Sequence, residues 1–136
     1  MQIFIVGSPL TTALSLDNKR FHNQITEARL ILEAIQTKRG WYKHPLAKMY
    51  EDYEEWVDLY IKTFKAVKVK DIILASEYSN KADSIKPPFL SQEFYNHMKS
   101  RLYTKNKEFY KDWCIFGESY INKYFISGEW KEYLQK

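Results

Sequence analysis

Residues 16–32 have the sequence LDNKRFHNQITEARLIL, in which apolar side chains recur every three or four positions, as on one face of a helix. The apolar residues on this spacing are Phe21, Ile25, Ala28, Leu32 and Ile35. Asp17 or Asn18 would cap the start, because a short side-chain oxygen accepts hydrogen bonds from free backbone N–H groups. The pattern predicts a helix that continues to about Lys38 and ends at Gly40.

A polar stripe occupies the opposite side of this predicted helix. Arg20, Asn23, Gln24 and Glu27 also follow helical spacing. A lone acid on a helix is usually solvated, so the pattern by itself favours a wet surface. The alternative is that Glu27 belongs to a site and takes part in chemistry.

The rest of the chain predicts a mainly α protein, a compact single-domain helical bundle with three principal helices over residues 1–136. We expect helices at about 45–67 and 91–113, a short helix near 118–124, and a loop over 79–88. Residues 1–6 would form a short strand or a buried extended arm, 7–16 a turn and a short helical turn, and 72–75 a strand or more helix. The inward side chains of the helix at 91–113 would be Phe94, Met98, Leu102, Phe109 and Trp113, and Trp130 and Tyr133 would pack back on the body.

The composition is that of a globular protein with an unusual aromatic content. Apolar residues make up 45% of the 136 residues and aromatic residues 17%. The net charge of +4 permits an anionic partner without requiring one. The chain has neither a signal-peptide pattern nor an apolar run of the roughly 20 residues that a membrane span needs, so we expect a cytoplasmic protein without membrane contact.

No familiar cofactor or metal motif occurs in the chain. The single cysteine, Cys114, excludes an internal disulfide and a cysteine-based zinc site. His22, His44 and His97 lack the HxxxH and HxH spacings, and glycine-rich nucleotide loops are missing from the sequence. We therefore expect no metal and no cofactor.

Two segments concentrate positive charge beside aromatic residues. Residues 38–48 contain four cations and no acid around the stretch GWYKHP, and residues 97–111 contain six basic side chains, His97 included, against one acid. Cations paired with aromatic faces suit phosphates and stacked bases. The simpler alternatives are a loop anchored by a buried Trp41 and a solvated helix face.

Three segments, taken in order, carry a resemblance to a known family. They are Asp17 with Phe21 and Glu27-Ala28, GWYKHPL at 40–46, and HMKSRLYTKNKEFY at 97–110 with its cations Arg101 and Lys105. In this order and spacing the chain resembles the pyrimidine-dimer DNA glycosylases of the endonuclease V type from phages and bacteria. The positions that correspond to small or arginine residues in a well-known phage member are Gln2, Ile3 and Thr26 here.

The resemblance implies a compact helical domain that acts on double-stranded DNA as a glycosylase and abasic-site lyase. In that family the N-terminal amine attacks the sugar C1′, which here would be the amine of Met1, and Glu27 corresponds to the carboxylate that stabilises the cationic sugar. The polar stripe would then be the wall of a cleft. The residues expected to bind nucleic acid or nucleotide are Arg20, Gln24, Arg29, Trp41, Tyr42, Lys43, His44, His97, Arg101 and Lys105.

Two other functions are compatible with the same residues. A non-catalytic protein, for example a phage-encoded one that sequesters a free nucleotide or a signalling dinucleotide, needs the cations and aromatic residues but no nucleophile. A structural or partner-binding module would instead use exposed Tyr and Trp side chains for protein contacts.

Overall fold

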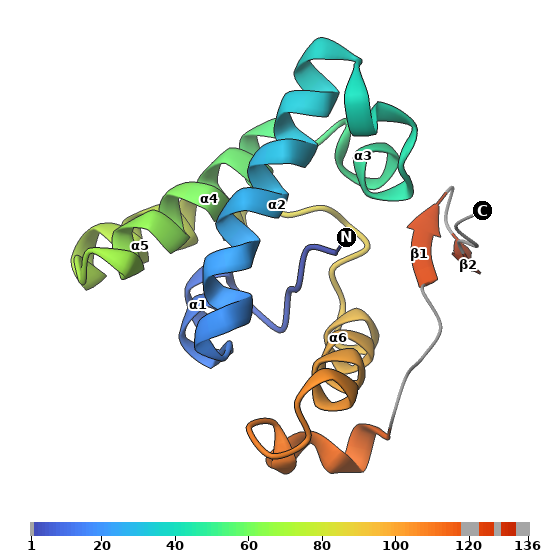
Figure 1. The fold of residues 1–136 in the computed structure, drawn as a ribbon. Helices are drawn as coiled ribbons and strands as arrows, with labels where there is room; N and C mark the ends of the chain where they lie inside the picture. Colours follow the sequence, from blue (N-terminus) through green and yellow to red (C-terminus); the bar gives the residue numbers. More distant parts are fainter. Residues whose placement is uncertain (1, 118–122, 127–128, 133–136) are drawn as a thin grey trace.

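The computed structural model describes residues 2–117, 123–126 and 129–132, and its fold is mainly α, as predicted (Figure 1). The α-helices are α1 (Pro9–Ser15), α2 (Asn18–Thr37), α3 (Pro45–Tyr50), α4 (Glu54–Lys68), α5 (Ile72–Ser84) and α6 (Gln92–Lys105). Short 3-10 helices are η1 (Gly40–Lys43) and η2 (Lys111–Phe116), and the strands are β1 (Lys123–Ile126) and β2 (Glu129–Glu132). α4 and α5 pack as a hairpin that extends away from α6 and the strands (Figure 1).

The N-terminal residues 2–6 form a buried arm without regular secondary structure, and this arm crosses the middle of the molecule (Figure 1). Of the two predicted alternatives, the structure has the arm and not the strand. Ile3 and Ile5 are completely buried in the core. Burying each of these side chains stabilises the fold by about 1.5–3 kcal/mol, so the core itself holds the start of the chain in place.

The two N-terminal helices follow the prediction closely. Ser8 caps α1, because its hydroxyl accepts the Thr11 N–H at 3.1 Å. α2 begins one residue after Asp17 and ends at Thr37, and Lys38 closes it with a left-handed backbone at φ 57°. The predicted side-chain cap is wrong, because the Asp17 carboxylate makes no capping hydrogen bond and instead contacts Tyr110 and Arg20. The predicted apolar face of α2 is buried or half-buried against the core.

The single helix predicted at about 45–67 is wrong, because the chain breaks between α3 and α4. Tyr53 has non-helical angles of φ −129° and ψ 37°. In a continuous helix Tyr50 and Trp56 would point in different directions, since six residues correspond to about 600° of rotation. The break lets the two rings stack at 5.8 Å with an interplanar angle of 11° in the core.

The polar loop predicted over 79–88 is also wrong in its first half, where α5 continues to Ser84. The Asp71 side chain caps α5 by accepting the Leu74 N–H at 3.1 Å. Ser79 is buried, and its hydroxyl accepts the Leu10 N–H at 3.1 Å. The polar composition predicted a loop here, but the segment is helical, and the polar side chain of Ser79 is satisfied by a hydrogen bond from α1.

The helix predicted at 91–113 ends early. Ser91 caps α6, and Phe94, Met98 and Leu102 are buried as predicted. At Asn106 the backbone leaves the helix, so the helical phase is lost and Phe109 is 54% exposed, contrary to prediction. Trp113 lies in η2 and is half-buried.

The C-terminal segment forms an antiparallel pair of strands, with Lys123 opposite Glu132 and Ile126 opposite Glu129. Of the short helix predicted near 118–124, residues 118–122 lie outside the described residues, and residues 123 and 124 belong to β1, so that part is wrong. The sequence KYFI favours a strand through its aromatic and β-branched residues. The predicted packing of Trp130 and Tyr133 concerns side chains outside the described part.

Candidate active site

The side chain of Gln24 joins the N-terminal arm to α2. Its Oε1 accepts the Phe4 N–H at 2.7 Å and a hydrogen bond from the Tyr60 hydroxyl at 3.0 Å. Its Nε2 donates to the Gln2 carbonyl at 3.0 Å and to Glu27 Oε2 at 3.1 Å. Gln24 is buried, and both ends of its amide are used, so it holds the arm at a fixed position along the helix.

The Glu27 carboxylate accepts a hydrogen bond from Gln2, the first residue that the structure describes. Its Oε2 accepts the Gln2 N–H at 3.4 Å, beside the hydrogen bond from Gln24. Tyr60 lies close by, because its single hydroxyl hydrogen is shared between the Phe4 carbonyl at 2.7 Å and Gln24 Oε1 at 3.0 Å. Burial raises the pKa of Tyr60 well above its usual value, and Tyr50 and the Glu27 carboxylate raise it further. The half-buried carboxylate and the start of the chain therefore share one region.

Basic side chains from α2 and α6 converge on the same region. The pKa of Lys105 is lowered, first by partial loss of hydration and then by the positive charges of Arg101 and Arg20. Glu27 opposes this effect and so acts on the same amine. Arg101 is buried, and Arg20 is half-buried. Three cations that act on one another in this way, with Glu27 near one of them, favour the binding of phosphate groups.

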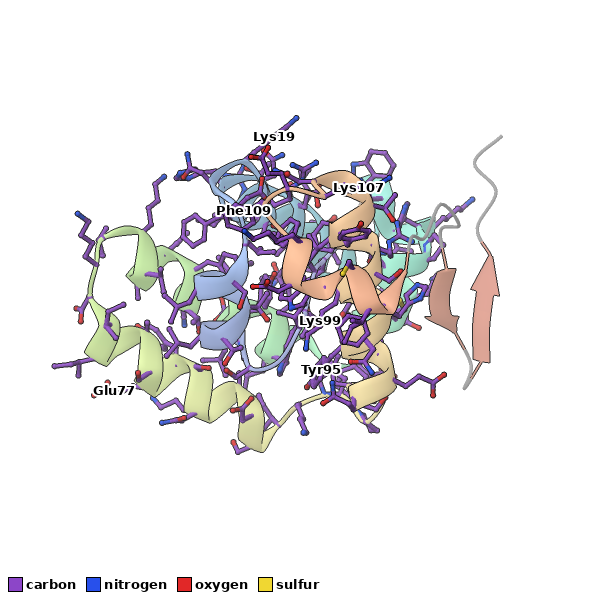
Figure 2. The ribbon with its side chains drawn as sticks, turned by 90° about the horizontal axis from the view of Figure 1, so that it is seen from below. Lys19, Glu77, Tyr95, Lys99, Lys107 and Phe109 are labelled. Atoms are coloured by element: carbon purple, nitrogen blue, oxygen red, sulfur yellow. The ribbon has the colours of Figure 1, made fainter. Side chains whose placement is uncertain are left out.

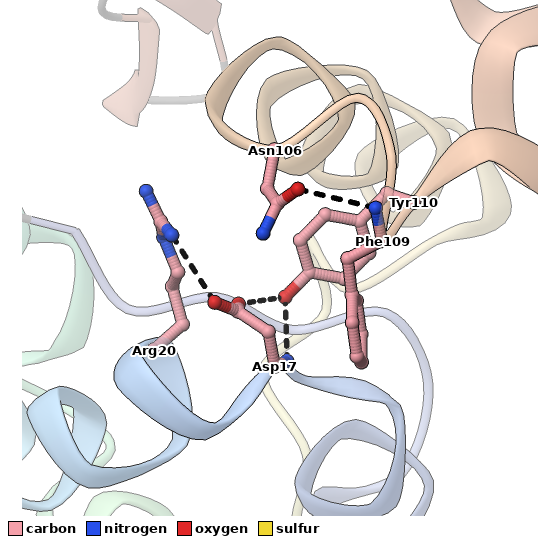
Figure 3. Close-up of polar contacts among 5 residues, drawn as sticks. All are labelled: Asp17, Arg20, Asn106, Phe109 and Tyr110. Carbon is pink, nitrogen blue, oxygen red and sulfur yellow. Dashed lines mark hydrogen bonds and ion pairs between the residues drawn. The ribbon is translucent and has the colours of Figure 1, made fainter.

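Asp17 and Tyr110 connect α2 to the turn that follows α6 (Figure 3). The Tyr110 hydroxyl donates to Asp17 Oδ1 and accepts the Asp17 backbone N–H at 2.8 Å. The other carboxylate oxygen pairs with Arg20 at 3.1 Å. Burial raises the pKa of Tyr110, and its hydrogen bond to Asp17 raises it further. This contact holds the C-terminal end of α6 near the N-terminal end of α2 and orients Arg20.

His44 is a buried, neutral capping residue. Its Nδ1 accepts the Leu46 N–H at 3.1 Å at the start of α3, so the other ring nitrogen carries the proton. Burial lowers the pKa of His44, and the positive charge of the amino terminus lowers it further. Trp41 meets the His44 ring edge-on at 5.7 Å and is 44% exposed, so the alternative of a loop anchored by a buried Trp41 is wrong.

The other predicted residues are distributed more widely. Arg29 is exposed on the far side of α2, because two residues correspond to about 200° of rotation from Glu27. Tyr42 contacts Lys48, whose Nζ lies 3.7 Å from the ring centroid, and its hydroxyl donates to Glu51 at 3.2 Å. Lys43 is exposed, and His97 is half-buried on α6.

No sequence pattern indicates the role of Tyr60. It lies 36 residues after Gln24 and follows the apolar spacing of α4, so it was expected only in the core. Likewise, Tyr110 is the last residue of the family motif at 97–110, but the sequence does not indicate its hydrogen-bond partner. In each case a polar tip completes a contact that only the tertiary structure brings together.

The described residues contain neither a cluster of metal ligands nor a membrane-spanning helix. Among those residues, no group of three or more His, Cys, Asp or Glu side chains could hold a metal ion. No helix in that part is long and apolar enough to span a membrane.

Comparison with known proteins agrees with this geometry. No curated protein and no solved structure matches the chain. The family model described as pyrimidine dimer DNA glycosylase matches residues 1–68, half of the chain. The matched half contains Arg20, Gln24, Glu27 and the stretch GWYKHPL, whereas the cations of α6 lie outside it. The chain therefore belongs to the pyrimidine dimer DNA glycosylase family.

Proposed function

We propose that this protein is a DNA glycosylase with associated abasic-site lyase activity, which uses its N-terminal amine and Glu27. The observation that carries the proposal is the hydrogen bond from the Gln2 N–H to Glu27 Oε2 at 3.4 Å. Covalent geometry keeps the amine nitrogen of Met1 within about 4 Å of that amide nitrogen. The residue whose N–H bonds to the Glu27 carboxylate is thus the direct neighbour of the residue that carries the primary amine.

The chemistry of an α-amine suits this role. Its pKa is near 8, so a large fraction is neutral at working pH, whereas most of a lysine amine is protonated. The amine nitrogen would bond to C1′ as the bond from C1′ to the base breaks, and the departing base would take up a proton. Loss of the amine proton and ring opening give an imine, and β-elimination then breaks the bond to the 3′ phosphate.

Glu27 would stabilise the positive charge that develops on the sugar and would move protons in both steps. Its hydrogen bonds with the Gln2 N–H and the Gln24 amide fix one carboxylate oxygen, Oε2. Arg20, Arg101 and Lys105 would bind the phosphates of double-stranded DNA on either side of the reacting nucleotide.

Borohydride trapping tests the proposal directly. The full chain is incubated with duplex DNA that contains one abasic site, or with irradiated duplex, and the reduced product is analysed by intact mass and peptide mapping. We expect a covalent adduct on the N-terminal residue. Glu27→Gln should keep duplex binding and lower adduct formation and strand cleavage by about 100-fold or more. Glu33→Gln, an exposed acid on the same helix, is the matched control. An adduct found only on a lysine would contradict the proposal.

A second candidate function depends on the same cations. Because Arg101 is buried beside Arg20 and Lys105, the cluster would also suit a protein that sequesters a free phosphate-bearing nucleotide without catalysis. A thermal-shift comparison separates the two functions. Large stabilisation by a mononucleotide or cyclic dinucleotide, with none by duplex DNA and no trapped adduct, would favour sequestration.

A further inference from the structure

A second groove lies on the other side of α2 from Glu27. It encloses about 410 Å³ between α1, the start of α2, the end of α4 and the turn after α6. Phe21 and His22 line it from α2. At about 100° of rotation per residue, these two positions lie roughly 120–140° around the helix axis from Glu27. The groove is therefore separate from the candidate active site.

The walls of this groove are apolar and aromatic, and part of that surface is open to water. Leu14 and Phe109, which line it from α1 and from the turn after α6, are 62% and 54% exposed. Phe21 is fixed from behind, because its ring stacks on Phe64 at 5.3 Å, and His22 meets Phe21 edge-on at 5.2 Å. A flat apolar ligand would cover Phe109 and Leu14 without displacing any core side chain.

The turn that presents Phe109 is held at both ends. The Phe109 N–H donates to Asn106 Oδ1 at 3.1 Å, and the next residue, Tyr110, is bonded to Asp17 (Figure 3). The backbone that carries Phe109 is therefore ordered before a ligand binds, which lowers the entropy cost of binding.

The rim of the groove is positively charged. Lys68 and Lys70 line its α4 side, and the described lining residues include no acid. Lys70 adopts a left-handed backbone at φ 62°, and its N–H donates to the Val67 carbonyl at 2.9 Å. Lys19 and Lys107 lie along the same edge of the molecule as Phe109 (Figure 2). The nearest acids in sequence are Asp17, Asp71 and Glu108. Asp17 is paired with Arg20 and accepts a hydrogen bond from Tyr110, Asp71 caps α5, and Glu108 is exposed.

We propose that this groove binds an unpaired nucleotide of a DNA strand. The base would stack on Phe109 against the wall formed by Phe21 and Leu14, and Lys68 and Lys70 would contact its phosphates. Two exposed lysines on the rim, Lys68 and Lys70, suit the successive phosphates of a strand better than a free mononucleotide. The choice of DNA as ligand rests on the proposed function, but the groove is a separate contact on the far side of α2.

Photo-crosslinking and anisotropy test the groove in the full chain. The probe is a fluorescein-labelled oligothymidylate of about twelve nucleotides with one 5-iododeoxyuridine. We expect crosslinks to peptides that contain Phe109 or His22. Phe109→Ala should weaken strand binding about tenfold, since base stacking on one aromatic ring contributes that much. Ile115→Ala, which removes another highly exposed apolar side chain, should change it less than about twofold.

The charge contribution has its own matched pair. Lys70→Gln should weaken strand binding by about threefold or more at low salt, because it removes one phosphate contact. Lys81→Gln is the control, since Lys81 is an exposed lysine on α5 that does not line the groove. Crosslinks that avoid both Phe109 and His22, equal affinities for Phe109→Ala and Ile115→Ala, or equal competition by polyglutamate and unlabelled oligothymidylate would each overturn the proposal.

Failure of the groove is distinguishable from failure of the proposed function. If borohydride adducts form at the N-terminus but Phe109→Ala binds the strand normally, the groove proposal fails and the glycosylase proposal stands. If no adduct forms but the strand crosslinks at Phe109, the reverse holds. Glu27→Gln should leave the strand crosslink at Phe109 in place, because Glu27 faces the other side of α2.

Discussion

The Tyr110 hydroxyl donates a hydrogen bond to the Asp17 carboxylate, and its oxygen accepts the Asp17 backbone N–H at 2.8 Å. These residues are 93 positions apart, and the contact is buried. It joins the start of α2, the helix that carries Glu27, to the turn after α6, the helix that carries Arg101 and Lys105. The arrangement of the candidate active site therefore depends on a contact between segments that are far apart in the sequence.

Tyr110→Phe should destabilise the fold by about 1–3 kcal/mol, because it leaves the Asp17 N–H without its partner and the carboxylate with only Arg20. Urea unfolding measures the change. Tyr42→Phe, which removes a partly exposed hydrogen bond to Glu51, should cost less than about 0.5 kcal/mol. A double-mutant cycle with Asp17→Asn should show coupling, and strictly additive effects would contradict this assignment.

Gln24→Leu should release the N-terminal arm. The change keeps the volume but leaves the Phe4 N–H and the Gln2 carbonyl without their partner, which we expect to cost about 2–4 kcal/mol. Hydrogen exchange should show faster exchange at the Phe4 amide than in the wild type. Gln36→Leu on the exposed side of the same helix should alter neither quantity, and equal exchange in the two variants would rule out the role assigned to Gln24.

The free energy of unfolding should depend on pH through His44. Because the pKa of His44 in the folded protein lies below 6.5, the unfolded chain binds more protons between the two pKa values. Stability contributed by neutral His44 is therefore complete above pH 6.5 and falls as the pH drops through the window below it. His44→Asn keeps a capping oxygen and removes the titration, so its stability should change less between pH 5 and pH 8, which urea unfolding at both values measures. An unchanged difference in stability between pH 5 and pH 8 for His44→Asn would contradict this assignment.

Lys105→Gln should weaken duplex binding by a few-fold at low salt and should reduce the slope of log K against log salt by about 0.9, because one phosphate contact is lost. Fluorescence anisotropy across a salt series gives both numbers. Lys81→Gln, at an exposed lysine on α5, should leave the slope unchanged. An unchanged slope for Lys105→Gln would mean that this cation does not contact the backbone of the duplex.

Local patterns predicted those parts of the fold that depend on local contacts. The spacing of Phe21, Ile25 and Ala28 gave the position and inward face of α2, and Gly40 and Pro45 bounded the connector that follows. The break at Tyr53 was missed, since it depends on the stacking of Tyr50 on Trp56. The helix through Ser79 was missed because this segment has the polar residue types of a loop. The sequence does not show that the Ser79 hydroxyl is buried and accepts a hydrogen bond from α1.

The candidate site divides in the same way. The sequence by itself determined which groups are available: a carboxylate at Glu27 on the polar side of an amphipathic helix, and cations at Arg20, Arg101 and Lys105. Only the tertiary structure decided that the arm lies along α2, so that the Gln2 N–H meets Glu27, and that Lys105 of α6 lies within electrostatic range of the same carboxylate. The physical reason is that helical periodicity fixes the direction of a side chain around its own helix axis. The distance between two segments is fixed by core packing and by buried hydrogen bonds such as those of Gln24 and Tyr110, whose partners are far away in the sequence.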